Sequence, residues 1–210
     1  GELERTYGRR MVDFGGLTVT TSLDLDLQKK VQKLVSDGVA KSSSLAITNG
    51  SAVVLDAKSA QILAYVGSID YFVDGWGAYD VVTAYRQPGS SIKPLTYAAA
   101  FEKGWTPSTV IWDIPSKFPP SGIPSDPMPP YEPVNYDGRF HGPVTVRSAL
   151  ANSFNIPAVK ALQYIGVYDD AAVAGEQGLV AFARRLGITT LTRPDYGLAL
   201  TLGGGDVSLM

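Results

Sequence analysis

The sequence predicts an α+β fold, in which helices pack on an antiparallel sheet of which two strands are readable. Two observations predict this class. A pair of short apolar runs is separated by only a few residues, and several later segments carry apolar residues at helical spacing. With 210 residues and 45% hydrophobic content, the chain is long enough and apolar enough to bury a core.

The beginning of the chain is predicted to be a linker over residues 1–22. Residues 1–16 are mostly polar and are expected to be extended, and residues 17–21 form a short run with high strand propensity. A helix should follow, with Ser22 or Asp24 as its N-cap. Its apolar positions recur at helical spacing until Gly38, which should stop or loosen it.

Residues 51–56 and 61–66 predict an antiparallel hairpin with a tight connection. Both runs are almost continuously apolar, which favours strands that helices cover on both faces. Residues 67–89 are rich in glycine and aromatic residues without a clear period, so we expect a loop there.

A second helix should begin close to Ser90 and end at Gly104, because Pro94 is tolerated only in a first helical turn. Residues 106–142 hold most of the prolines and predict a long surface connection. Three further helical segments are predicted at residues 144–150, 155–165 and 178–186, with Gly166 and Gly187 as stops.

Composition excludes several classes of function. A formal net charge of -2 with scattered basic residues argues against nucleic-acid binding. The absence of cysteine excludes disulfides, thiolate metal sites and cysteine nucleophiles. The only histidine, His141, lies in the proline-rich stretch and is interpreted as a surface loop residue. We therefore expect no metal, no cofactor and a catalytic base other than histidine.

Ser90 and Lys93 are the residues best suited to chemistry. They lie three residues apart at a predicted helix start, where side chains with this spacing share one face. A serine becomes a good nucleophile when a neighbouring base takes its proton, and a buried lysine can be that base if it is neutral. A Ser-x-x-Lys pair alone is also compatible with an ordinary exposed helix start.

The surroundings of this pair resemble a known family. Residues 86–94, Arg-Gln-Pro-Gly-Ser-Ser-Ile-Lys-Pro, are similar to the active-serine signature of class A penicillin-binding proteins. Residues 149–159, which include Ser153 and Asn155, are similar to the Ser-x-Asn motif of that family. Residues 16–19, the hairpin and the Leu-Gly-Gly turn within residues 200–204 extend the resemblance, and Asn135-Tyr136 and residues 142–145 resemble the segment that leads into the second motif.

The resemblance implies a fold like that of serine β-lactamases and D,D-transpeptidases. By this resemblance Ser90 attacks a peptidoglycan stem peptide and forms an acyl-enzyme, while Lys93 is the base. Ser153 would relay protons, and Asn155 would bind the substrate amide and fix Lys93. β-Lactam antibiotics would acylate Ser90 as substrate mimics.

The chain departs from the family at the third motif, because no lysine is followed by Thr-Gly or Ser-Gly. Residues 23–210 are therefore expected to be the N-terminal part of a transpeptidase domain. A second chain or a C-terminal remainder would supply the strand with the Lys-Thr-Gly motif. The resemblance places the protein on the outer face of the bacterial cytoplasmic membrane, as part of a membrane-anchored protein.

Two other functions remain open. A non-catalytic penicilloyl-binding sensor would use the same serine and stay acylated. A serine β-lactamase is less well supported, because no glutamate occurs in a context that suggests deacylation.

Overall fold

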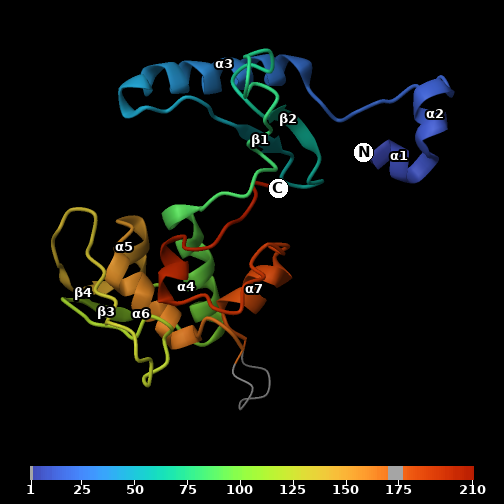
Figure 1. Cartoon of the computed structure of the whole chain (residues 1–210). Coiled ribbons are helices and arrows are strands. Elements are labelled where there is room, and N and C mark those ends of the chain that lie inside the picture. Colours follow the sequence, from blue (N-terminus) through green and yellow to red (C-terminus); the bar gives the residue numbers. More distant parts are fainter. Residues whose placement is uncertain (1, 170–176) are drawn as a thin grey trace. The chain divides into compact units, whose positions relative to one another are not determined.

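The computed structural model describes residues 2–169 and 177–210. Two compact units make up the chain. The first extends to Thr83 and includes Leu209–Met210, and the second comprises Ala84–Ser208. Each combines helices with a small antiparallel sheet (Figure 1), which confirms the predicted α+β class.

The first unit begins with two short helices, α1 (Glu2–Tyr7) and α2 (Arg9–Phe14). The predicted extended conformation of residues 1–16 is therefore wrong for these residues. Charged pairs at helical spacing, such as Arg9 with Asp13, support such helices. Residues 17–21 belong to no strand. The assignment of residues 1–22 as a linker stays a prediction.

Helix α3 (Leu25–Lys41) has Asp24 as its N-cap, which is one of the two predicted caps. The Asp24 carboxylate accepts hydrogen bonds from the backbone N–H groups of the first helical turn. The helix continues past Gly38, so of the two predicted effects, a stop or a loosening, the stop is wrong. An internal glycine costs about 1 kcal/mol of helix stability, which does not by itself end a helix. A short 3₁₀ turn, η1 (Ser43–Leu45), follows.

The predicted hairpin is confirmed as β1 (Ala52–Leu55) and β2 (Ile62–Val66), which pair antiparallel. The Asp56 carboxylate stabilises the connection by accepting hydrogen bonds from the backbone N–H groups of Lys58 and Ser59. Helix α3 packs on β2 (Figure 1). The prediction that helices cover both faces is wrong for the described residues, because most of β1 is only half-buried.

The Gln28 side chain binds α3 to the free edge of the hairpin. Its amide donates to the carbonyl oxygen of Tyr65 at 2.9 Å and accepts from the backbone N–H of Tyr65 at 2.7 Å. These two contacts replace those that a third strand would make with the edge of β2. Residues 67–89 follow as turns and loop, as predicted, up to the 3₁₀ turn that contains Gly89.

The second unit begins its helical part with η2 (Gly89–Ile92) and α4 (Lys93–Glu102). This confirms the helix predicted near Ser90 and adds that its first turn is a 3₁₀ turn. Strands β3 (Val110–Asp113) and β4 (Gly142–Thr145) pair antiparallel. The prediction of a mere surface connection over residues 106–142 is therefore wrong at β3, whose residues alternate between exposed and buried.

The remaining helices of this unit are α5 (Val146–Ala151), α6 (Asn155–Ile165) and α7 (Leu179–Arg185), followed by η3 (Leu198–Leu202). The α6 bounds match the prediction, and α5 starts after β4 rather than at residue 144. Gly166 and Gly187 follow their helices with positive φ, as predicted stops should. None of the described helices is long and apolar enough to cross a bilayer.

Helix α6 lies at the centre of the main core. It buries seven residues along its length, and α4, α7 and η3 contribute to the same core (Figure 1). Because α4 carries Lys93 and α6 begins with Asn155, the packing of these two helices sets the distance between two of the residues that the sequence singled out.

Candidate active site

The four predicted site residues all lie in the second unit. Ser90 is in η2, Lys93 begins α4, Ser153 lies in the turn between α5 and α6, and Asn155 begins α6. The structure brings three of them together by hydrogen bonds. The Lys93 ammonium donates to the Ser153 carbonyl oxygen at 2.5 Å, to Ser153 Oγ at 3.1 Å and to Asn155 Oδ1 at 2.7 Å.

Lys93 is a buried cation without a carboxylate among its hydrogen-bond partners. Its side chain is 1% exposed, and this burial lowers the pKa of Lys93 to about 8. An ammonium has three N–H donors, which match the three acceptors on Ser153 and Asn155. The lysine can therefore stay protonated in this site, yet it loses its proton far more readily than a lysine in water.

Ser90 is exposed, and within the described part of the chain its hydroxyl makes no hydrogen bond. The backbone N–H of Lys93 donates to the carbonyl oxygen of Ser90, so the two residues are one turn apart. No hydrogen bond joins their side chains, and the three ammonium protons have acceptors on Ser153 and Asn155. A neutral Lys93 has a free lone pair, which could accept the Ser90 proton.

Ser153 adopts a left-handed conformation with a φ of 55°, which is costly for a residue with a Cβ. The turn is closed by hydrogen bonds from Ser153 N to Leu150 O and from Phe154 N to Ala149 O. In this conformation both the carbonyl oxygen and the hydroxyl of Ser153 reach Lys93. Such local strain is typical of functional sites.

The backbone of the Ser90 turn packs against a glycine near the end of the chain. Gly89 has a φ of 57° and Gly203 a φ of 95°. A Cβ on Gly203 would lie 2.3 Å from the Gly89 Cα, so only glycine fits there. A buried hydrogen bond of 2.8 Å between the hydroxyls of Thr96 and Thr201 also joins α4 to η3. The position of Ser90 thus depends on the turn within residues 200–204.

A second set of polar residues supports Asn155, and the sequence reasoning did not identify it. Asn135 Oδ1 accepts a hydrogen bond from the Asn155 backbone N–H at 2.7 Å, and the Asn135 amide donates to the buried carboxylate of Asp113. The Asp113 side chain is fully buried. Only Asn135 gave a signal, as part of the resemblance before the second motif, and nothing in the sequence marks Asp113.

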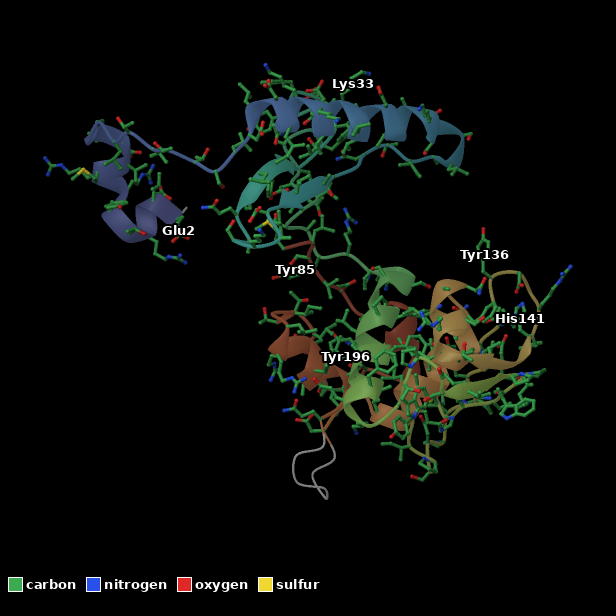
Figure 2. The ribbon with its side chains drawn as sticks, turned by 180° about the vertical axis from the view of Figure 1, so that it is seen from behind. Glu2, Lys33, Tyr85, Tyr136, His141 and Tyr196 are labelled. Atoms are coloured by element: carbon green, nitrogen blue, oxygen red, sulfur yellow. The ribbon has the colours of Figure 1, made fainter. Side chains whose placement is uncertain are left out.

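His141 is a loop residue, as predicted, but it is anchored on both sides. Its ring stacks on Phe154 with a centroid distance of 4.0 Å, and its Nδ1 lies 2.7 Å from Asp113 Oδ2. The side chain is 30% exposed. Figure 2 shows His141 and Tyr136 on one loop, and Asn135 directly precedes Tyr136 in the sequence. His141 therefore belongs to the supporting network and makes no hydrogen bond to any of the four predicted site residues.

Comparisons with known proteins show which family the chain belongs to. The model of the penicillin binding protein transpeptidase domain matches residues 50–195. Penicillin-binding protein 1F of Bacillus subtilis is 36% identical over 194 residues, which are 90% of this chain and 23% of that protein. The crystal structure of penicillin-binding protein 1A from Haemophilus influenzae is 31% identical, with a TM-score of 0.63 over 76% of this chain and 21% of that one.

A second similar structure is penicillin-binding protein A of Mycobacterium tuberculosis, described as an imipenem acyl-enzyme complex. It is 23% identical and has a TM-score of 0.70, over 100% of this chain and 54% of that one. This likeness supports the fold. The chain spans less than a quarter of the length of the curated relatives that lead the comparison. The family match covers well over half of the chain, and the chain therefore belongs to the penicillin-binding protein transpeptidase domain family.

Proposed function

We propose that this chain carries the nucleophile and proton-transfer residues of a D,D-transpeptidase that cross-links peptidoglycan stem peptides. The observation that carries the proposal is the buried Lys93, held by Ser153 and Asn155 one turn after an exposed Ser90. Burial favours the neutral amine, and a neutral amine beside a hydroxyl is the arrangement that serine acyl transfer needs.

In the proposed reaction, Ser90 Oγ forms a bond to the carbonyl carbon of the penultimate D-alanine, and its proton passes to neutral Lys93. The bond to the terminal D-alanine nitrogen then breaks. The leaving amine takes a proton from Lys93 through the Ser153 hydroxyl, which lies 3.1 Å from the lysine nitrogen. An amine of a neighbouring stem attacks the resulting ester by the reverse sequence of proton transfers, which releases Ser90.

Asn155 has two tasks in this scheme. Its Oδ1 accepts from Lys93, and its Nδ2, which donates to the Val134 carbonyl oxygen at 2.7 Å, has a second N–H that would bind the substrate amide. β-Lactams would acylate Ser90 in place of the stem peptide, in line with the acyl-enzyme state of the mycobacterial neighbour.

We also propose where the protein acts and which further strand would complete the substrate site. A strand with a Lys-Thr-Gly motif, from a second chain or a C-terminal remainder, would bind the substrate carboxylate. The protein would act on the outer face of the cytoplasmic membrane as part of a membrane-anchored protein, where stem peptides are cross-linked. The family of its relatives supports this setting.

The test is acylation of the natural full-length protein by a fluorescent penicillin, followed by mass analysis of the labelled peptide. We expect one adduct, at Ser90, which Ser90→Ala abolishes. Ser91→Ala is the matched control, because Ser91 is the adjacent exposed serine and its hydroxyl only donates to the Pro88 carbonyl oxygen. Labelling of Ser90→Ala at the wild-type level would refute the proposal.

Two further readouts separate the alternative functions. Release of D-alanine from a stem pentapeptide, with formation of a cross-linked product, indicates a transpeptidase. A stable adduct without stem-peptide turnover indicates a penicilloyl-binding sensor, and rapid hydrolysis of the antibiotic indicates a β-lactamase.

A further inference from the structure

We propose that Asn135, held in place by the buried carboxylate of Asp113, is the positioning residue that sets the orientation of Asn155 and, through it, of Lys93. This inference rests on the proposed function. It assigns a role to residues outside the two motifs, which the structure connects to the lysine through successive hydrogen bonds.

The Asn135 side chain is fixed because both ends of its amide are used. It is 3% exposed. Its Oδ1 accepts from the Asn155 N–H at 2.7 Å, and its Nδ2 donates to Asp113 at 2.8 Å and to the Arg139 carbonyl oxygen at 2.8 Å. A flipped amide would place two donors against each other at Asn155 and two acceptors against each other at Asp113. Only one orientation therefore satisfies the site.

The contact with Asn155 also completes the start of α6. The residue before this helix, Phe154, has no side-chain oxygen that could cap it, and no side-chain cap hydrogen bond forms there. Asn135 instead supplies an acceptor from a distant loop to the first N–H of the helix. With Asn155 Nδ2 donating to Val134 O, two contacts from one loop hold Asn155 while its Oδ1 faces Lys93.

Asp113 is the anchor of this arrangement. It ends β3, is fully buried, and accepts hydrogen bonds from Asn135 Nδ2 and from the His141 backbone N–H, besides its contact with His141 Nδ1. A buried carboxylate is costly unless several donors surround it, so these contacts are what make its burial possible.

The charged and titratable groups around Asp113 come from several elements. Tyr97 on α4 has a pKa that burial, and secondarily the Asp113 charge, raises. The pKa of Lys160 on α6 is lowered by burial, and the charge of Asp113 opposes part of this effect. His141 faces Asp113 with one ring nitrogen and Asp137 with the other. Of these groups, His141 contacts the carboxylate directly, and together with Asn135 it holds the carboxylate in place. Asn135 transmits that position to Asn155.

The first experiment measures the acylation rate of the natural full-length protein by fluorescent penicillin between pH 6 and about pH 10. Asn135→Ala should lower the maximal rate by about tenfold to a hundredfold, because a small displacement of a proton acceptor is that costly. It should also move the midpoint of the alkaline rise to lower pH, because a loosely held Asn155 stabilises the protonated Lys93 less well.

Asp126→Ala is the control. Asp126 is also a loop carboxylate that accepts backbone hydrogen bonds, from Ser121 and Met128, but it has no contact with the Asn135 network. We expect this variant to keep the wild-type rate and midpoint. Thermal unfolding of each variant corrects the measured rate for any loss of folded protein.

The second experiment exchanges the two side chains. Asn135→Asp alone places two carboxylates in contact and should lose activity. The double variant Asp113→Asn with Asn135→Asp restores a donor opposite an acceptor between these two positions and keeps an acceptor for the Asn155 N–H. Neither variant has a donor for the Arg139 carbonyl oxygen, so the rescue should be partial. We expect the double variant to acylate at least about tenfold faster than Asn135→Asp alone.

The outcomes distinguish this inference from the proposed function. If the wild-type protein is not labelled at Ser90, the proposed function fails. If the wild type is labelled and Asn135→Ala keeps the wild-type rate and midpoint, the positioning role is overturned. It is also overturned if the rate falls only in proportion to unfolding and the exchange gives no rescue.

Discussion

The two units of the chain bury their hydrophobic residues to very different extents. In the first unit, the core cluster consists of Val31, Ala64 and Val66, and the side-chain amide of Gln28 on α3 binds the edge of the hairpin. In the second unit, a much larger cluster surrounds α6. All four predicted site residues lie in this second unit. A lysine stays buried without a carboxylate partner only where its surroundings cannot relax, so the larger core is a condition for the proposed chemistry.

The largest expected effect tests this difference in the cores. Leu162→Ala removes a fully buried side chain from the second unit and should lower its free energy of unfolding by about 3 kcal/mol. Val31→Ala in the small cluster should cost only about 1 kcal/mol. Urea unfolding combined with hydrogen exchange, which reports each unit separately, measures both values. Equal losses would show that the two cores are equivalent in strength.

The next prediction concerns the glycine contact that supports Ser90. Gly203→Ala should reduce acylation by about thirtyfold, because the new Cβ displaces Gly89 and with it the nucleophile. Gly104→Ala is the matched control. Its φ of 96° imposes a similar conformational strain, but a Cβ there would meet nothing within 4 Å. Similar losses of acylation in both variants would mean that strain, rather than the displaced turn, limits the reaction.

The pH dependence sharpens the contrast between buried and exposed lysines. With the pKa of Lys93 at about 8, acylation should rise about tenfold between pH 7 and pH 9 as the amine becomes neutral. Stability should follow the same direction. Above about pH 8 the folded state has released a proton that the unfolded chain keeps up to about 10.5, so the free energy of unfolding rises across this window.

Lys93→Met should remove the pH dependence of both acylation and stability, because an apolar side chain of similar length does not titrate. Lys33→Met is the comparison in the first unit, where the lysine side chain is 75% exposed and pairs with Asp37. Stability curves measured by urea unfolding from pH 7 to about pH 9, below the range in which tyrosines titrate, should flatten for Lys93→Met and keep the wild-type slope for Lys33→Met. A flat acylation profile in the wild-type protein would exclude Lys93 as the base.

The smallest expected effect concerns the first unit. Gln28→Ala leaves the N–H and carbonyl groups of Tyr65 without their partners and should destabilise the hairpin by about 1 kcal/mol. Lys33→Ala removes only an exposed ion pair and should change stability by less than about 0.5 kcal/mol. Exchange of the Tyr65 amide proton should accelerate in Gln28→Ala alone. Unchanged exchange would show that packing, and not the amide contacts, holds α3 on the hairpin.

The elements that could be predicted from the sequence are those whose formation depends on residues close together in the chain. Helix α6 was predicted with its observed bounds, because apolar spacing and a terminal Gly166 are sufficient signals. Strand β3 was missed, because a four-residue alternation between prolines is too short to recognise. The contact of Asp113 with Asn135 joins loops and strands far apart in the sequence, and no local pattern encodes it.

The same reasoning explains the remaining errors. Helices α1 and α2 depend on charged pairs rather than on an apolar face, so hydrophobic periodicity does not reveal them. Gly38 was predicted to stop or loosen the helix because glycine commonly follows the last turn of a helix, but α3 continues through it. The hydrogen bonds of Lys93 to Ser153 and Asn155 connect residues that the resemblance singled out, whereas nothing in the sequence reveals the burial of Lys93.

The close approach of Gly203 to Gly89 has a consequence for biosynthesis. A ribosome makes Ser90 long before it makes Gly203, and until then the turn that carries the serine lacks the backbone against which it rests. An emerging polypeptide should therefore be a poor target for penicillin. Reactivity toward the antibiotic would appear only once the later segment has been translated and has docked.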